Sequence, residues 1–283
     1  MPELPEVETV CRGLEPALVG ATFERVEQRR ANLRFPFPKN MPERLEGRAV
    51  EALKRRSKYI LVVLDDGNVL VMHLGMSGRI QIDPARRNEP PAKHDHVIFH
   101  MSNGQVVTYN DARRFGSMSL IDQAELGAHR MFKNLGIEPL ETAFDARYLA
   151  KCAFGKSVDL KAFLMDQRNI AGLGNIYVCE ALFRAGLSPN RQASSLARKD
   201  GSPSARTPRL VRAIKDVLEA AILAGGSTLR DHKQVDGSLG YFQHSFSVYG
   251  RAGEICGNSS CDALVQRIKQ AGRSTFYCGR CQG

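Results

Sequence analysis

The chain has 283 residues, of which 43% are hydrophobic and 25% charged, values typical of a globular protein with one large core or two ordinary ones. Forty Lys and Arg against thirty Asp and Glu give a net charge of +10, which favours a polyanionic partner. No apolar run is long enough to span a membrane, and the acidic start MPELPEVETV lacks the basic and apolar regions of a secretory signal. We therefore expect a soluble, cytoplasmic protein.

The first predicted element is a helix from Pro5 to about Leu18. Its apolar residues recur at helical spacing, Pro5 suits a first helical position, and Glu6 and Glu8 suit the positive end of the helix dipole. Gly20 is a plausible end.

Short apolar runs separated by turn residues follow. YILVVL and VLVMHL flank DDGN at residues 59–74, HVIFHM and VVTY flank SNGQ at 96–109, and GSMSLI adds a strand at 116–121. This succession predicts an antiparallel sandwich or barrel up to about residue 122.

Helical periodicity replaces the strand pattern after Pro139. The predicted helices cover residues 145–154, 157–167, 174–186 and 208–226. Between the last two, residues 190–209 are rich in Ser, Pro, Gly and Arg, which predicts a flexible surface connection.

The last predicted element is a metal module. Cys256 and Cys261 form one close pair and Cys278 and Cys281 another, sixteen residues later, a pattern that can place four thiolates around one structural Zn²⁺ in a closed site. Chance pairs of buried or disulfide-bonded cysteines are the alternative. Two β-like stretches meet at Ala271-Gly272, which predicts a zinc-ribbon hairpin with Arg273 near its tip.

A glycine-rich turn lies between two of the predicted helices, in DQRNIAGLGNIYVCEALF. Gly172 and Gly174 would let the backbone approach a ligand, and amides near Asn175 would point at an anion. The third glycine of a dinucleotide fingerprint is absent, so a helical corner that holds a DNA backbone fits better. A corner whose glycines serve only packing remains the alternative.

Seven motifs in order give the chain its resemblance to the bacterial formamidopyrimidine-DNA glycosylases. They are PELPEVET at residues 2–9, KY at 58–59, HLGMSG at 73–78, KHDHV at 93–97, DARRFG at 111–116, DQRNIAGLGNIY at 166–177 and GRSTFYCGRCQ at 272–282. Two departures are visible: four residues instead of two lie between the first cysteines, and residues 190–209 look longer than the family norm and receive no role.

The resemblance implies an α+β multidomain fold. Its parts are an N-terminal antiparallel β-sandwich with an N-terminal helix (1–138), a helix–two-turn–helix domain (139–244) and a C-terminal zinc-ribbon finger (245–283). It also implies a bifunctional DNA glycosylase and abasic-site lyase, a monomer that removes oxidised purines from double-stranded DNA, uses one structural zinc ion and associates with the nucleoid when bound to DNA.

Removal of Met1 would leave Pro2 with a free secondary amine. An α-amino group titrates near pH ~8, against ~10.4 for a lysine, so a useful neutral fraction exists at physiological pH. Attack on the anomeric carbon would expel the base and form an iminium, after which the strand is cut by β,δ-elimination. A disordered terminus would be the simpler interpretation of the decapeptide alone.

The resemblance assigns further catalytic roles. Glu3 becomes the acid beside the nucleophile, Lys58 a catalytic or phosphate-contacting lysine, and Arg273 the finger residue that holds a phosphate. Without the resemblance, Lys58 would be a solvated base projecting from the first hairpin strand. Glu6 is either a positioning or proton-accepting group, or ordinary N-terminal helix electrostatics.

DNA contacts are also assigned by resemblance. A base must leave the stack before it can react, so an apolar wedge has to fill the gap. Met76 and Phe115 are the implied wedges, and Arg113 would bond the widowed cytosine, whereas without the resemblance Met76 and Phe115 would be core residues. Residues 227–242 match a loop over the damaged base, and phosphate contacts are expected from three residues, His94, Lys156 and Asn175.

His94, Asp95 and His96 invite a metal interpretation, which we reject because the sequence offers no third ligand on the face that the two histidines share. Three other protein classes compete. Endonuclease VIII has the same fold, but Leu4 and the RRFG sequence favour the purine enzyme. A silent DNA-binding zinc protein would tolerate an unprocessed Met1. A proline tautomerase would have no use for a zinc tail.

Overall fold

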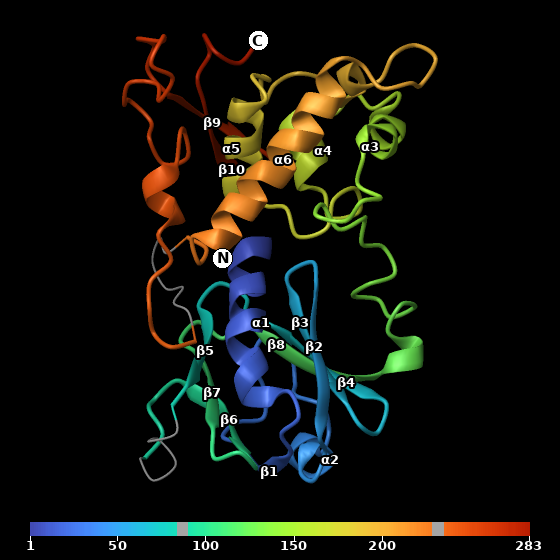
Figure 1. Ribbon diagram of the computed structural model, residues 1–283, viewed down its shortest axis with the longest axis vertical. Helices are drawn as coiled ribbons and strands as arrows, with labels where there is room; N and C mark the ends of the chain where they lie inside the picture. Colours follow the sequence, from blue (N-terminus) through green and yellow to red (C-terminus); the bar gives the residue numbers. More distant parts are fainter. Residues whose placement is uncertain (84–89, 228–234) are drawn as a thin grey trace. The chain divides into compact units, whose positions relative to one another are not determined.

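A computed structural model describes residues 1–83, 90–227 and 235–283. The chain divides into two compact units (Figure 1). Unit 1 contains Met1–Lys133 and Ile222–Gln243, and unit 2 contains Asn134–Ala221 and His244–Gly283. Each is described by itself. The loop predicted at residues 227–242 lies partly outside the described residues, which omit 228–234.

Unit 1 begins with the helix α1 (Leu4–Leu18), which confirms the helix predicted from Pro5. One face buries a stripe that includes Val7, Val10 and Leu14, and the chain leaves the helix through Gly20 at φ +80°. The core of unit 1 therefore holds α1 along its length.

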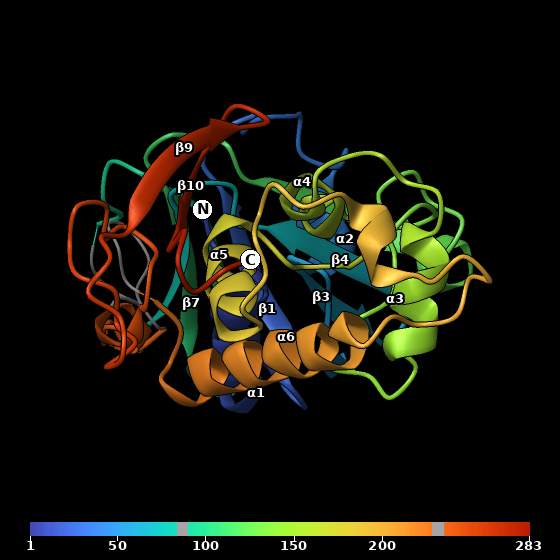
Figure 2. The same ribbon diagram turned by 90° about the horizontal axis from the view of Figure 1, so that it is seen from above.

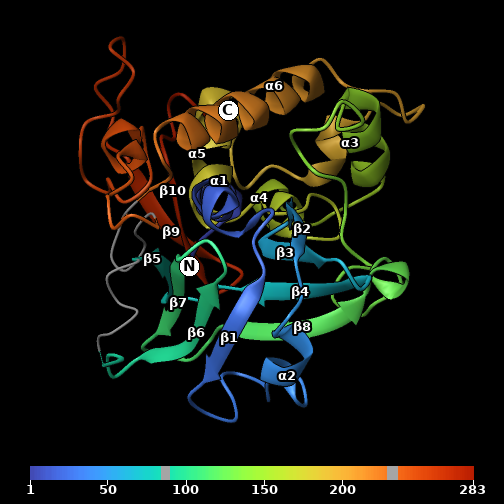
Figure 3. The ribbon, with the colours of Figure 1, turned by 60° about the horizontal axis from the view of Figure 1, so that its bottom comes forward.

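Two four-stranded antiparallel sheets follow, in the orders β1-β6-β7-β5 and β2-β3-β4-β8 (Figure 3). The predicted strands all form: β3 (Tyr59–Leu64), β4 (Asn68–His73), β6 (Asp95–Met101), β7 (Val106–Asp111) and β8 (Ser117–Asp122). Side chains of α1 and of both sheets share one hydrophobic core, which includes Leu14, Val62 and Phe99. The predicted sandwich is confirmed.

Sequence reasoning missed four elements of unit 1: β1 (Phe23–Gln28), α2 (Met41–Leu45), β2 (Val50–Arg56) and β5 (Gly78–Ile82). The three strands all lie at the edge of a sheet. An edge strand buries little of its surface, so FERVEQ and VEALKRR carry charges where a central strand would carry apolar residues. Their pairing is a tertiary property.

Unit 2 contains the predicted helices in slightly shorter form, together with a two-stranded hairpin (Figure 2). Asp145 and Asp159 cap two of them by accepting the backbone N–H groups of Tyr148 and Ala162, both at 2.7 Å. The elements are α3 (Ala146–Ala153), α4 (Leu160–Met165), α5 (Asn175–Arg184), α6 (Arg206–Leu223, whose last two residues are assigned to unit 1), β9 (Gln266–Gln270) and β10 (Arg273–Tyr277).

Residues 190–209 are not the flexible surface connection that their composition predicts. They contain the short 3-10 helix η3 (Ala193–Leu196), and Ala193 and Leu196 are completely buried. The Ala193 N–H donates to Val158 O at 2.9 Å, and the Ser204 N–H donates to Leu196 O at 2.9 Å. Tertiary packing overrides the polar composition, and α6 begins within the stretch.

Two further 3-10 helices are short: η2 (Gln123–Glu125) in unit 1 and η4 (Phe242–Ser245) where the units meet in sequence. Among the described residues, no helix is both long and apolar enough to cross a membrane.

Candidate functional site

Pro2 and Glu3 lie at the start of α1, and both are buried although they are almost terminal. Glu3 and Glu6 form a capping box, in which the Glu3 N–H donates to Glu6 Oε2 at 2.8 Å. Met1, in contrast, is 48% exposed. The second residue is thus held in a fixed place, while the residue before it is accessible to a processing enzyme.

The Glu6 carboxylate is buried and has a second partner. Its Oε1 accepts from both the backbone N–H and the hydroxyl of Ser227, each at 2.9 Å. Gly226 adopts φ +81°, and a Cβ there would lie 3.2 Å from Glu6 Cγ. The Glu6 carboxylate therefore both completes the capping box of α1 and ties the start of this helix to Ser227.

Lys58 lies in the turn between β2 and β3, and it is buried instead of solvated as the sequence alone suggested. The turn contains Ser57, whose φ of +56° is unusual for a residue with a side chain. Arg55 Nη1 donates to Ser57 O at 3.1 Å, and Arg55 Nε donates to Glu8 Oε2 of α1 at 2.8 Å. The helix that carries Pro2 and the turn that carries Lys58 are therefore joined through Arg55.

Burial opposes ionisation of Glu8, but hydrogen bonds from Arg55 and Arg12 outweigh it and lower the pKa of the carboxyl. His73 shows the opposite balance. Burial, together with the positive charges of Lys58 and Arg34, lowers the pKa of His73 to about 4. The imidazole is therefore neutral at physiological pH, and its Nδ1 accepts the Gly75 N–H at 3.0 Å.

Met76 and Phe115, the implied wedges, are 38% and 44% exposed, as a wedge requires and a core residue would not be. Met76 follows the end of β4, and Phe115 precedes the start of β8. The guanidinium carbon of Arg113 lies 5.0 Å from the centroid of the Phe115 ring, within cation–π range. Unit 1 therefore presents two apolar side chains and an arginine from two neighbouring loops.

The two loops touch through backbone atoms. A Cβ on Gly75, which has φ +63°, would lie 2.3 Å from the carbonyl carbon of Phe115, so only glycine allows this approach. Arg114 adopts φ +57°, a conformation that costs a residue with a side chain about 1–2 kcal/mol. The wedge residues thus stand on strained, closely packed backbone.

His94 is half-buried just before β6, and its carbonyl accepts the Asp111 N–H at 3.1 Å. The His94 and His96 rings lie 6.3 Å apart, and His96 Nε2 is 2.8 Å from Asp111 O. Among the described residues, the four cysteines form the one cluster whose ligand atoms could hold a metal. The metal interpretation of His94 and His96 therefore gains no support.

In unit 2, the four sulfurs of Cys256, Cys261, Cys278 and Cys281 lie within 4.8 Å of one another. The Cys256–Cys281 and Cys261–Cys278 Sγ distances are 3.8 and 3.7 Å. A tetrahedron with Zn–S bonds of ~2.3 Å has S–S edges of about 3.8 Å. The residues therefore fit a zinc ion, and the longer spacing of the first pair does not disturb the arrangement.

The β9–β10 hairpin turns at Ala271 and Gly272, both at positive φ, and exposes Arg273 beside the turn as predicted. Asn175, the first residue of α5, donates from Nδ2 to Ser274 O at 2.9 Å. Lys161 of α4 is 1% exposed and donates from Nζ to Thr275 Oγ1 at 2.6 Å. Asn175 and Arg273 are thus brought together, and a buried lysine holds the strand next to them.

Glu180 anchors the chain that enters the finger. It is completely buried on α5, and its carboxylate accepts the N–H groups of Ser247, Val248 and Tyr249 at 2.9, 3.0 and 2.8 Å. Three charge-assisted bonds on one carboxylate account for its burial. The chain that leads into the finger is therefore fixed to α5 by the Glu180 carboxylate.

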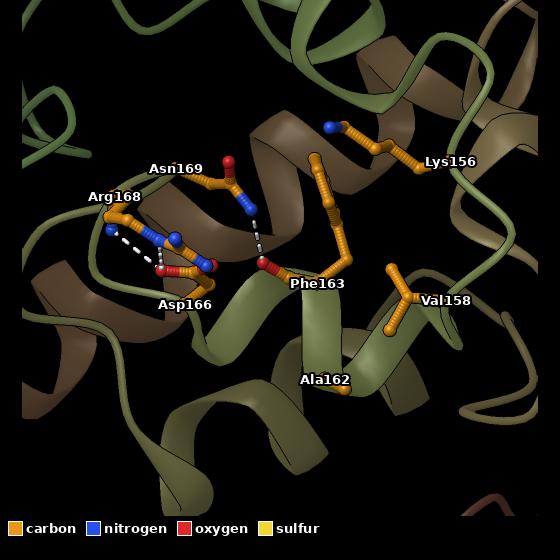
Figure 4. Close-up of a pocket in the computed structure, with 7 residues that line it drawn as sticks. All are labelled: Lys156, Val158, Ala162, Phe163, Asp166, Arg168 and Asn169. Atoms are coloured by element: carbon orange, nitrogen blue, oxygen red, sulfur yellow. Dashed lines mark hydrogen bonds and ion pairs between the residues drawn. The ribbon is translucent and has the colours of Figure 1, made fainter.

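Lys156 is exposed at the rim of a pocket of about 430 Å³ in unit 2 (Figure 4). Arg168 is ion-paired with Asp166 at 2.6 Å, and Asn169 Nδ2 donates to Phe163 O at 2.9 Å. The lining combines cationic and apolar groups: Lys156, Val158, Ala162, Phe163, Asp166, Arg168 and Asn169. Lys156 and Arg168 thus line the same pocket.

Models of three domain families match the chain. They are the formamidopyrimidine-DNA glycosylase N-terminal domain at residues 1–118, the H2TH domain of that glycosylase at 135–233, and a zinc finger found in FPG and IleRS at 259–283. The formamidopyrimidine-DNA glycosylase of Beijerinckia indica is 59% identical, with 100% of both chains covered. The chain belongs to the formamidopyrimidine-DNA glycosylase family.

Two solved structures are similar to this glycosylase over 99% of both chains. The Lactococcus lactis Fpg in complex with DNA containing an abasic site has a TM-score of 0.86 at 32% identity. MutM in complex with DNA containing carbocyclic 8-oxo-G has a TM-score of 0.85 at 35% identity. Family membership makes the chain a DNA repair enzyme, a DNA glycosylase with AP lyase activity, and its cysteine cluster a structural zinc site.

Sequence reasoning missed the residues that hold this glycosylase's functional side chains, namely Arg55, Asp111, Lys161, Glu180 and Ser227. Asp111 is the first residue of DARRFG, and Glu180 is the last residue of GNIYVCE. A carboxylate within a motif was the one feature of the sequence that could have pointed to these two residues. Nothing in the sequence pairs Glu180 with residues 247–249, because 67 positions separate it from the first of them.

Proposed function

We propose that this glycosylase removes oxidised purines, such as 8-oxoguanine and formamidopyrimidines, from double-stranded DNA and then cuts the abasic strand by β,δ-elimination. The observation that carries the proposal is the buried Pro2–Glu3 pair at the start of α1, behind an exposed Met1. The relatives bound to abasic-site DNA and to 8-oxo-G DNA support the substrate class. We further propose that the enzyme acts as a monomer at the nucleoid.

Once Met1 is removed, the lone pair of the Pro2 nitrogen attacks C1′ of the damaged nucleotide. The C1′–N9 bond breaks, and the base leaves with its bonding electrons and takes up a proton. The C1′–O4′ bond then opens, Glu3 gives a proton to O4′, and an iminium joins Pro2 to the sugar. Pro2 loses its own proton to solvent in forming this cation.

The iminium acidifies the C2′–H bond. Loss of that proton expels the 3′-phosphate, and a second elimination expels the 5′-phosphate, after which water hydrolyses the imine and restores Pro2. Lys58, buried beside neutral His73, supplies a positive charge for a phosphate or for the sugar. Arg273 holds a departing phosphate from the tip of the zinc hairpin.

Base extrusion precedes this chemistry. Met76 and Phe115 fill the gap in the stack, and Arg113 donates to the widowed cytosine. Their exposure on two neighbouring loops supports these roles. His94, Lys156 and Asn175 contact backbone phosphates, and the net charge of +10 adds a non-specific attraction to DNA. The domain boundaries that we propose are the predicted ones, 1–138, 139–244 and 245–283.

The test is borohydride trapping with a duplex that carries 8-oxoguanine opposite cytosine. We expect a covalent adduct that maps to Pro2, and loss of that adduct in Pro2→Glu, whose large second residue keeps Met1 in place. Pro16→Ala, which changes an exposed proline in the same helix, is the matched control and should trap DNA as the parent does. An adduct on a lysine, or full activity in protein that retains Met1, would contradict the mechanism.

Lesion preference is measured in the same assay. Duplexes that carry an oxidised pyrimidine in place of 8-oxoguanine should be cut more slowly, and faster cutting would favour the endonuclease VIII alternative.

A further inference from the structure

Asp111 ends β7 and is completely buried, yet its carboxylate bonds outward to the two loops that carry the wedge residues. Oδ1 accepts the Ser77 hydroxyl at 2.6 Å, and Oδ2 accepts the Gly116 N–H at 2.8 Å. Ser77 directly follows Met76, and Gly116 directly follows Phe115. One carboxylate therefore holds the neighbour of each wedge.

The same network reaches the arginine. Ser77 Oγ, while donating to Asp111, accepts the Arg113 N–H at 3.0 Å. The backbone of Arg113 is thus tied to the loop of Met76 through one hydroxyl. Each of the three residues assigned to base extrusion is therefore close to this network in the chain. Met76 and Phe115 precede residues that bond to the Asp111 carboxylate, and Arg113 bonds to Ser77 directly.

The backbone that the network holds is strained at Arg114, which has a φ of +57° although it carries a side chain. Such conformations persist only where the surroundings fix them, and they tend to occur at functional sites. Gly75 also lies so close to the Phe115 carbonyl that no side chain fits between the two loops there. A buried charge that bonds to both loops provides the constraint that this backbone needs.

If Asp111 served only to stabilise the sandwich, its carboxylate would be expected to bond to the neighbouring strands. In the described part of unit 1, it is the carbonyl of Asp111, not its carboxylate, that meets the neighbouring strand through His96 Nε2. Both carboxylate oxygens serve the loops instead. Short hydrogen bonds to a buried charge are strong and directional, so they suit the fixing of a loop conformation.

We propose that Asp111 is a positioning residue for base extrusion, which holds Met76, Arg113 and Phe115 as one rigid group through Ser77 and Gly116. The proposal rests on the extrusion role given to those three residues above. It places the effect of Asp111 on opening of the duplex and not on the chemistry at Pro2, and the two steps can be measured separately.

The experiment compares two substrates under single-turnover conditions. The first is a duplex with 8-oxoguanine opposite cytosine, which must be opened, and the second is a single strand with an abasic site, which needs no extrusion. For Asp111→Asn and Ser77→Ala, we expect the duplex rate to fall about tenfold or more, a loss at least fivefold larger than that on the single strand. Ser77→Ala removes one hydroxyl only, so it tests the network if Asp111→Asn fails to fold.

A fluorescent cytosine analogue opposite the lesion supplies a second readout. Its signal on binding reports loss of stacking, and both variants should slow that signal, as should Met76→Ala. Asp122→Asn is the matched control, because Asp122 also accepts a backbone N–H, from Ala124 at 2.8 Å, but at an exposed position away from both loops.

Equal losses on the two substrates would overturn the proposal, as would an unchanged duplex rate in both variants. Failure of the parent enzyme to excise 8-oxoguanine at all would instead contradict the proposed function.

Discussion

The two units hold their functional residues by different means. In unit 1, Pro2, Lys58 and Met76 stand on elements whose other faces share one large hydrophobic core. In unit 2, Arg273 stands on a two-stranded hairpin, and the buried members of the apolar cluster near its base are, in the described part of the chain, Cys179, Val248 and Val265. Folding alone therefore places Pro2, the proposed nucleophile, whereas the placement of Arg273, the proposed phosphate contact, depends on metal and on buried polar bonds.

The largest effect should follow removal of zinc. Structural zinc contributes about 10–16 kcal/mol of apparent folding free energy in isolated fingers, far more than the small clusters around this finger can replace. We expect a chelator, or Cys278→Ser, to abolish zinc content and excision activity together, while the calorimetric transition of unit 1 remains. Zinc analysis and scanning calorimetry measure the two outcomes.

The control is Cys152→Ser, since Cys152 is a half-buried cysteine of unit 2 that lies outside the cluster. It should leave zinc content and activity unchanged. Simultaneous loss of the unit 1 transition on chelation would contradict the contrast between the units.

A smaller loss is expected from Glu180→Gln. The substitution removes the charge that binds three N–H groups and leaves one acceptor oxygen for them, which should cost about 3 kcal/mol of unfolding free energy. The midpoint of unit 2 unfolding should fall while zinc stays bound. Glu219→Gln, an exposed glutamate on α6, is the matched control. A midpoint equal to the parent's would show that the Glu180 hydrogen bonds add nothing to the stability of unit 2.

The unfolding free energy of unit 1 should depend on pH through the protonation of His73. The pKa of this residue is about 4 in the folded chain and near 6.5 when unfolded, so between these values the unfolded state binds the extra proton. The unfolding free energy should therefore decline by about 2 kcal/mol as pH falls from 6.5 to 4. His73→Gln should flatten this decline in thermal unfolding curves, and His129→Gln, in the same unit, should not.

The smallest effect concerns the ion pair between α1 and the Lys58 turn. Because its folded pKa is lowered, ionised Glu8 adds stability at pH 7 that is lost as pH falls below 4.5 and through the folded pKa. Arg55→Met should cost about 1 kcal/mol at pH 7 and less in acid. A double-mutant cycle with Glu8→Gln at both pH values measures the coupling energy between the two side chains. A coupling near zero at pH 7 would show that this ion pair does not stabilise the contact between α1 and the Lys58 turn.

Local pattern was sufficient for much of the fold. The stripe of Val7, Val10 and Leu14 predicted α1, and the central strands showed themselves as apolar runs because both of their faces are covered. Edge strands such as β1 and β2 were missed because their stability comes from a partner strand and not from their own composition. The prediction of a flexible connection at residues 190–209 was wrong for a related reason, since Ala193 and Leu196 are buried by distant segments.

The candidate site divides in the same way. Motifs pointed to Pro2, Glu3 and the four cysteines, whose chemistry is intrinsic to their side chains and spacing. Burial of Lys58 could not be predicted, because the exposure of a turn residue is set by segments that pack against it only after folding. The partners of Glu6 and Asp111 come from chain segments that meet only after folding.

The sequence by itself determined which reactive groups this protein possesses and which segments become helix, central strand or zinc ribbon, because those properties depend on side-chain chemistry and on periods of a few residues. The tertiary structure decided which carboxylates bind which loops, and which lysines lose contact with water. Those outcomes depend on burial and on hydrogen bonds between residues far apart in the chain. Removal from water strengthens such hydrogen bonds and makes an unpaired polar group costly.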